Sequence, residues 1–245
     1  MSENTKTLAF VTAMCVVVAL ALTGLRQATL PIAKANEALF NRQAMLSSLG
    51  DNLTVGGTPV ADAQSMPKAD VDAIFGNAKT LQQFALDMEG NVLEGVKAED
   101  VDMEAEEKKD EADRRLPLFV YTNETGKKFY IIAVRGNGLW DKIWGNIALT
   151  EDLKTVAGVA FDHKGETPGL GAEIKDNKDW KNLFNGKSIF TADGSVALNV
   201  RKGGAQDKMY DVDGLSGATV TGNGVTEMLQ RGIGYYEPYF KTLKK

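Results

Sequence analysis

The sequence predicts an α+β protein, in which an antiparallel β-sheet with flanking helices follows one apolar N-terminal helix. Residues 7–25 carry no charged side chain. Residues 116–161 alternate apolar runs with turns that contain glycine, asparagine or aspartate, a pattern typical of antiparallel strands. Glycine-rich loops follow, and a helical pattern closes the chain. Strands and helices segregated in this way indicate an α+β domain.

The composition limits the function. The 245 residues are 43% hydrophobic and 25% charged, which allows a packed core. A net charge of −5 argues against a basic surface for nucleic acid, so no nucleic-acid partner is expected. The single cysteine, Cys15, and the single histidine, His163, exclude an internal disulfide, a cysteine-cluster metal site and multi-histidine catalysis. We therefore expect no metal site and a structural role for His163.

The apolar N-terminal segment has the length of a membrane span. Its nineteen residues lie between Lys6 and Arg26, and a span needs about 20 apolar residues. We predict a short tail over residues 1–6, a transmembrane helix over residues 7–25 and an amphipathic helix beyond it. A cleavable signal peptide is the alternative, but the apolar run continues past the small residues at 19–21. Basic residues flank both ends, so charge counting leaves the orientation open.

Residues 26–98 are expected to form a membrane-proximal helix and a spacer. The pattern within it predicts a turn or linker at 56–59, a short helix at 70–75 and a strand at 84–88 that ends at Gly90 and Asn91. Residues 99–115, called here the charged segment, contain nine acidic and four basic side chains. Such a block predicts a solvated surface helix or loop, and a docking surface for a partner is the alternative.

The main domain is expected to span residues 116–245. Turn signals separate its apolar runs into two hairpins. The expected strands are residues 116–121, 128–134, 145–149 and 155–161. Aromatic residues near the C-terminus recur at helical spacing and predict a packing face, made of Tyr235, Tyr236, Tyr239 and Phe240.

Three glycine-rich loops carry the candidate functional residues: 136–140, 163–173 and 213–225. None contains the phosphate-loop pattern of nucleotide-hydrolysing proteins. The dinucleotide-binding pattern fails in the first loop, because Asp141 stands where its third glycine belongs. These observations argue against nucleotide hydrolysis and against NAD binding by a Rossmann fold.

The third loop places small and hydroxyl residues just before a helical stretch. Ser216 and Thr219 would leave backbone amides open to a phosphate, or would simply cap the helix. Both interpretations remain open from spacing alone. Thr219 has no activating base beside it in the sequence, so a role as hydrolytic nucleophile is not expected.

Other candidates also have two interpretations. Glu166 and Thr167 would either hydrogen-bond the edge of a heteroaromatic ring or shape a tight turn. Trp140 and Trp144 are four residues apart, so on a helix they would share one face and pack in the core, whereas stacking on a flavin is the alternative. Lys202 would present a cation to a phosphate or a reduced flavin, or is an ordinary loop lysine.

Four motifs carry a resemblance to a known family: GLW at 138–140, GETPGLGAE at 165–173, KGGA at 202–205 and DGLSGATVTGNGV at 213–225. Over nearly its whole length the sequence resembles the C subunit of the bacterial Na+-translocating NADH:quinone reductase. It is also similar to the G subunit of the related ion-translocating ferredoxin:NAD reductase. The resemblance implies one N-terminal span followed by an FMN-binding domain. The charged segment is not part of the family pattern and is expected to insert as a surface loop.

The resemblance assigns site residues. A flavin transferase of this family links FMN through its phosphate to the threonine that corresponds to Thr219. The transferase would recognise Asp213, Ser216, Gly217, Ala218 and Thr219. The cofactor-binding residues implied are Trp140, Glu166, Thr167, Gly169, Leu170, Lys202, Ser216, Gly217, Ala218 and Thr221.

The resemblance also implies a function: an electron-relay subunit that is not an enzyme by itself but part of a Na+-translocating oxidoreductase. The implied partners are the B, D and E subunits and the flavin transferase. The domain would lie on the periplasmic side of the bacterial inner membrane, on a single-pass anchor. The alternatives are the equivalent protein of the ferredoxin-linked complex, a membrane-anchored module that binds FMN reversibly, and a structural assembly protein. Covalent flavin on Thr219 would distinguish the two electron-relay functions from the other two.

Overall fold

The N-terminal part of the protein is one long helix. The computed structural model describes residues 2–243 and divides after Arg42 into two compact units. The first unit is formed by helix α1 (Glu3–Ser47) as far as Arg42, and the last residues of the helix, from Gln43, belong to the second unit. The predicted apolar and amphipathic helices are therefore one continuous helix. By length and composition α1 is able to cross a membrane, and none of its most apolar window is buried within the structure.

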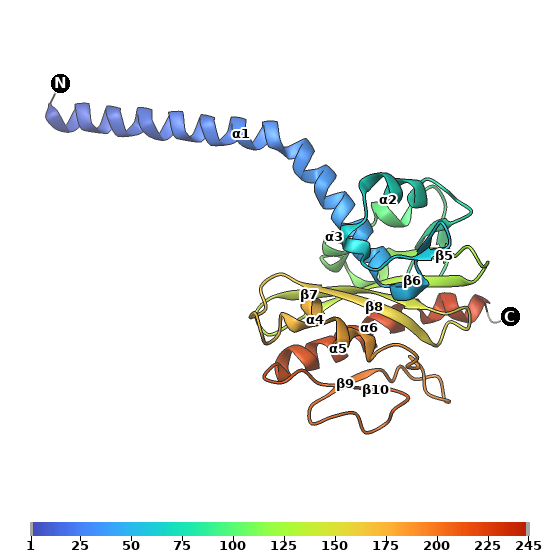
Figure 1. Cartoon of the computed structure of the whole chain (residues 1–245). Helices are drawn as coiled ribbons and strands as arrows, with labels where there is room; N and C mark the ends of the chain where they lie inside the picture. The colour runs from blue at the N-terminus through green and yellow to red at the C-terminus, as the bar shows by residue number, and fades with distance from the viewer. Residues whose placement is uncertain (1, 244–245) are drawn as a thin grey trace. The chain divides into compact units, whose positions relative to one another are not determined.

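A six-stranded sheet organises the second unit, and each neighbouring pair of strands is antiparallel (Figure 1). The predicted fold class, an antiparallel sheet with flanking helices after an apolar N-terminal helix, is confirmed. The strand order is β4-β3-β5-β6-β7-β8. The strands are β3 (Leu81–Leu86), β4 (Val92–Leu93), β5 (Leu116–Thr122), β6 (Lys128–Asn137), β7 (Lys142–Leu149) and β8 (Val156–His163).

Residues before 98 contribute more than a spacer. Strand β3 pairs with β5 along its whole length, so that Gln83 lies opposite Phe119. The compact unit accordingly begins at Gln43, and the boundaries expected at 98 and 116 do not separate it. The remaining elements before the charged segment are small: β1 (Thr54–Val55), β2 (Thr58–Pro59), α2 (Lys68–Phe75) and the 3₁₀ turns Gly50–Asn52 and Ala63–Ser65.

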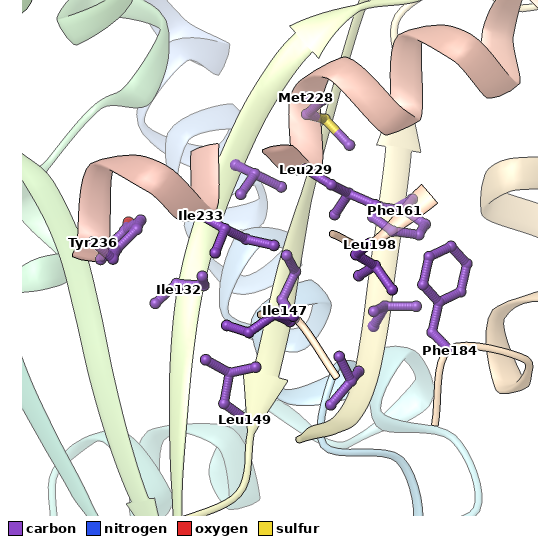
Figure 2. Close-up of a cluster of buried hydrophobic side chains, with 14 of the residues drawn as sticks. Ile132, Ile147, Leu149, Phe161, Phe184, Leu198, Met228, Leu229, Ile233 and Tyr236 are labelled. Atoms are coloured by element: carbon purple, nitrogen blue, oxygen red, sulfur yellow. The ribbon is translucent and has the colours of Figure 1, made fainter. Parts of the chain in front are cut away.

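Helix α6 (Thr219–Leu243) covers one face of the sheet and closes the main core. Figure 2 shows its apolar side chains directed toward strand residues such as Ile132 and Ile147. A Cβ atom at Gly232 would lie 2.5 Å from Val134 Cγ1, so the helix backbone lies very close to β6. The same face carries α4 (Glu173–Asp176), α5 (Lys178–Asn182) and the parallel pair β9 (Asn199–Arg201) and β10 (Asp211–Asp213).

The C-terminal aromatic residues pack as predicted. Tyr236 is fully buried, and its hydroxyl donates to the Pro117 carbonyl at 2.9 Å. Its ring stacks on that of Phe240, with centroids 6.3 Å apart. Burial raises the pKa of Tyr236, because the ionised phenolate would lose its hydration.

The opposite face of the sheet has its own apolar layer. The rings of Phe75 in α2 and Phe119 in β5 meet edge to face at 6.2 Å. Tyr121 is buried beside Phe129, and its hydroxyl accepts a hydrogen bond from the Thr54 amide at 3.3 Å. Burial on both faces explains why β5 reads as a nearly continuous apolar run.

The charged segment is a largely exposed surface helix with turns, as its composition predicted, and ion pairs attach it to the sheet. It forms α3 (Met103–Glu107) and the 3₁₀ turns Ala98–Asp100 and Glu111–Asp113. Glu106 is buried and binds Arg115 and Lys109. Glu107 forms ion pairs with Arg135 at 3.1 Å and with Lys142 at 2.7 Å. Composition alone did not show these partners, because Arg135 and Lys142 come from strands later in the chain.

Candidate functional site

All three glycine-rich loops and the start of α6 line one cavity of about 180 Å³. The first two loops leave the ends of β6 and β8, while the third glycine-rich loop leads directly into α6. The antiparallel register brings Ile143 opposite His163, so loops that follow β6 and β8 lie at the same end of the sheet. The cavity is lined by Leu139, Glu166, Thr167, Leu170, Gly171 and residues 217–221.

The first turn of α6 presents unused backbone donors to this cavity. The first amide of the helix with a backbone partner is that of Gly222, which donates to the Ala218 carbonyl at 2.9 Å. Within residues 2–243, the amides of Thr219, Val220 and Thr221 donate to no other group. Three free amides at the start of a 25-residue helix form a favourable site for an anion, since the helix dipole adds a partial positive charge there.

The loop before α6 has a shape that only glycine permits. Gly217 has a φ of +73°, which is the left-handed region. A Cβ atom at this position would lie 2.6 Å from Leu170 Cδ2. Ala218 is buried behind it, and Thr219 is exposed at the first position of the helix. Thr219 is therefore exposed to solvent, while the neighbouring Gly217 packs closely against Leu170 of the second loop.

Glu166 lies at the centre of the loop cluster and is only 4% exposed. Its Oε1 accepts a hydrogen bond from the Trp140 amide at 2.9 Å. Its Oε2 accepts from the Thr221 hydroxyl at 2.6 Å. Its own amide donates to Nδ1 of His163 at 3.1 Å, so the histidine is a hydrogen-bonded structural residue. One side chain thus connects the two loops and the first turn of α6.

Two glycines make room for this carboxylate. A Cβ atom at Gly138 would collide with Glu166 Oε1, and one at Gly171 would collide with Oε2 and with Thr221 Oγ1. Gly169, in the same loop, has a φ of +73° and supports a tight turn. The glycine content of these loops therefore reflects close packing around a buried charge.

The rim of the cavity is apolar and exposed. Trp140 lies beside the lining residues and not among them; it is 69% exposed, and its Nε1 donates to the hydroxyl of the lining residue Thr167 at 3.1 Å. Leu139, Leu170 and Val220 are each exposed by 42% or more. Trp140 lies in the turn between β6 and β7, whereas Trp144 lies within β7 under the Arg135 guanidinium. The expectation that the two tryptophans share a helix face is wrong, because this segment is a hairpin.

Some predicted residues lie outside the lining of the cavity. Lys202 is exposed in the loop after β9, and its Cα is 3.4 Å from the position that a Cβ atom at Gly214 would occupy. Asp213 accepts from the Ala205 amide at 2.6 Å, which fixes this loop beside the start of the DGLSGAT string. Ser216 is exposed next to the lining residues. Their roles in cofactor binding or transferase recognition remain predictions.

A family model described as "FMN-binding domain" matches residues 138–234, which include the end of the first loop, the whole of the other two loops and most of α6. The C subunit of the Na(+)-translocating NADH-quinone reductase of Pseudomonas aeruginosa is 42% identical over 134 residues, 51% of each chain. The chain thus spans about half the length of the first relatives that it matches. The corresponding C subunit of Vibrio anguillarum is 32% identical over 89% of this chain and 84% of its own length.

Solved structures of C subunits also match this chain. The crystal structure of the C subunit from Parabacteroides distasonis matches with a TM-score of 0.69 and 30% identity, over 85% of this chain and 95% of that chain. The crystal structure of Shewanella oneidensis NqrC matches with a TM-score of 0.69 and 28% identity, over 86% of this chain and 99% of that chain. Both matches extend well beyond the loops of the candidate site.

Proposed function

The chain belongs to the family of C subunits of the Na(+)-translocating NADH-quinone reductase, and from this membership we propose that it is the electron-relay subunit of such a complex. In this proposal the chain carries FMN covalently, through a phosphoester to Thr219. One observation carries the proposal: an exposed threonine hydroxyl begins a helix whose first three amides are free and line a cavity.

The residues present fit an esterified phosphate. The Thr219 hydroxyl is accessible to another enzyme, and the free amides of Thr219, Val220 and Thr221 are donors for phosphate oxygens. The helix dipole contributes about half a positive charge at the same end. The net change is the addition of FMN to the Thr219 oxygen with loss of one water.

The rim fits the ring of a flavin. Trp140, Leu139 and Leu170 offer apolar surface on which an aromatic ring packs, and the Thr167 hydroxyl offers a polar contact. When bound, FMN supplies the electron-transfer chemistry, and the protein supplies position and electrostatics. These side chains would hold the ring near its attachment point and limit its contact with water. The phosphoester keeps the ring at a high effective concentration at this site.

The wider assignments follow from family membership and from α1. We place the chain in the bacterial inner membrane, as a single-pass protein with its second unit on the periplasmic side. Its proposed partners are the B, D and E subunits of the complex and a flavin transferase that modifies Thr219. The equivalent protein of the ferredoxin-linked complex and a module that binds FMN reversibly are the alternatives to be tested.

The test is the intact mass of the full chain after export together with a flavin transferase, followed by peptide mapping. The expected result is a gain equal to FMN less one water, located on Thr219. Thr219→Ser is the matched control and should remain modified, because it keeps the acceptor oxygen. An unmodified chain, with a transferase that is active on another substrate, would overturn the covalent assignment. FMN that copurifies but is lost on denaturation would favour the reversible module.

A further inference from the structure

Helix α6 begins with the sequence TVT, and its two threonines, Thr219 and Thr221, have different environments. Residues two positions apart on a helix point in nearly opposite directions, since each residue turns the chain by about 100°. Thr219 is exposed, whereas Thr221 is 1% exposed and donates its hydroxyl proton to Glu166. Both residues line the same cavity. The protein therefore distinguishes two chemically identical acceptors by orientation.

Glu166 is bound by the protein itself. Its two carboxylate oxygens each accept one hydrogen bond, from the Trp140 amide and from the Thr221 hydroxyl. A buried carboxylate is costly unless such donors satisfy it. Gly138 and Gly171 let the two loop backbones pack closely against this side chain, because a Cβ atom at either position would collide with it.

We propose that Glu166 is a positioning residue that selects Thr219 over Thr221 as the flavin acceptor, by holding Thr221 inward and fixing the first turn of α6 to the loop at Trp140. This inference rests on the proposed function for the identity of the modification. The positioning itself is a property of the unmodified chain. Glu166 acts in this account through Trp140 and Thr221 and not through contact with the flavin.

The first test uses the unmodified full chain and measures hydrogen exchange. Glu166→Ala should speed exchange of the Trp140 amide and of the Gly222 amide by about tenfold or more, the effect of losing a hydrogen bond to a charged group. Glu166→Gln should stay near the wild type, because its amide group keeps contacts with both partners. Unchanged exchange at both amides in Glu166→Ala would overturn the positioning role.

Two controls separate positioning from general destabilisation. Glu173→Ala removes a half-buried carboxylate from the same loop region, one whose side chain forms no hydrogen bond or ion pair within residues 2–243, and should leave both amides unchanged. Thr221→Val removes only one donor, so it should speed exchange at Gly222 and not at Trp140. This second variant keeps the proposal testable if Glu166→Ala fails to fold. Equal acceleration of hydrogen exchange at both amides in Thr221→Val would contradict the proposal that Glu166 holds Trp140 and Thr221 through two separate hydrogen bonds.

The second test locates the flavin after treatment with the transferase. Glu166→Ala should show about a tenfold slower modification of Thr219 and measurable FMN on Thr221, where the wild type shows none. Modification of Thr219 alone at the wild-type rate would overturn the selection of the acceptor. If the wild type itself takes no flavin, the proposed function fails, and the exchange experiment still decides whether Glu166 positions the helix.

Discussion

The charged segment and the loop cluster around Glu166 both link distant parts of the chain through buried or half-buried carboxylates, but these carboxylates have different donors. Glu106 and Glu107 bind cationic side chains, among them Arg115 and Arg135. Glu166 binds a backbone amide and a hydroxyl, both neutral. The space between the charged segment and α6 is about 30 Å³, whereas the loop cluster encloses about 180 Å³.

This difference indicates that the charged segment forms a structural contact, whereas the loop cluster forms a site with space and free backbone donors for a ligand. Cationic partners neutralise Glu106 and Glu107, and little volume remains beside them. At the loop cluster the carboxylate is satisfied by neutral donors, and the free amides of α6 remain available. We therefore expect changes in the charged segment to alter stability and changes in the loop cluster to alter flavin attachment.

Thr219→Val should produce the largest effect, a complete loss of covalent flavin. Valine keeps the shape of threonine but has no acceptor oxygen, and residue 219 is exposed, so the free energy of unfolding should change by less than about 0.5 kcal/mol. In-gel flavin fluorescence and a urea titration measure the two quantities. Flavin fluorescence that persists in this variant would show that another residue is the acceptor.

Glu106→Ala should lower the free energy of unfolding by about 2–3 kcal/mol and leave flavin attachment intact. The side chain is 2% exposed, and its removal leaves Arg115 and Lys109 without their carboxylate partner. Glu104→Ala is the matched control, because Glu104 is 61% exposed and should contribute little. Urea titration gives the stability, and intact mass gives the attachment. If both variants lowered the free energy of unfolding by the same amount, burial of Glu106 would not explain its effect, and the contrast between the charged segment and the loop cluster would fail.

Acid should weaken the charged segment through protonation of Glu106. Burial raises the pKa of Glu106, but hydrogen bonds from Lys109 and Arg115 outweigh it and hold the pKa below its usual value of 4.5. The stability that this group contributes is therefore present above pH 4.5 and is lost as the pH falls through the lowered pKa. Urea midpoints of the wild type and Glu106→Gln should converge as the pH is lowered from 6 to about 3. A constant difference across this range would contradict the assignment.

Trp140→Phe should have the smallest effect. It removes one hydrogen bond, from Nε1 to Thr167, at a side chain that is 69% exposed. The free energy of unfolding should change by less than about 0.5 kcal/mol. The absorbance spectrum of the attached flavin should shift if the indole packs against the ring, and the intact mass should remain that of the modified chain. An unchanged spectrum would remove Trp140 from the proposed flavin contacts.

Local patterns in the sequence predicted much of the fold. The hairpin of β5 and β6 and the aromatic face of α6 follow from alternation and helical spacing, which depend only on neighbours in the chain. The two-residue strand β4, which pairs with β3, is too short to give a pattern. A strand was predicted at 84–88 but was assigned to a spacer, because the pairing of β3 with β5 spans a long connection. The same limit applies to Glu107, whose partners lie on β6 and β7.

The candidate site was predicted through its motifs rather than through its geometry. The resemblance singled out Glu166, Trp140 and Thr221, but no pattern indicated that Glu166 accepts hydrogen bonds from the other two. That arrangement arises because β6 and β8 end at the same edge of the sheet, beside the start of α6. The glycines at 138 and 171 were the available signal, since paired glycines in separate loops often mark a close approach.

The contact between α6 and β6 would limit the reach of a cofactor attached at Thr219, as proposed above. Thr219 begins a helix that is held to the sheet by close contacts at Gly224 and Gly232 and ends in the aromatic core. The proposed phosphoester would therefore be attached to a helix that is packed on the sheet, and not to a mobile loop. The length of the ribityl chain, together with the side chains at the cavity, would then define how far the ring can reach toward an electron donor or acceptor.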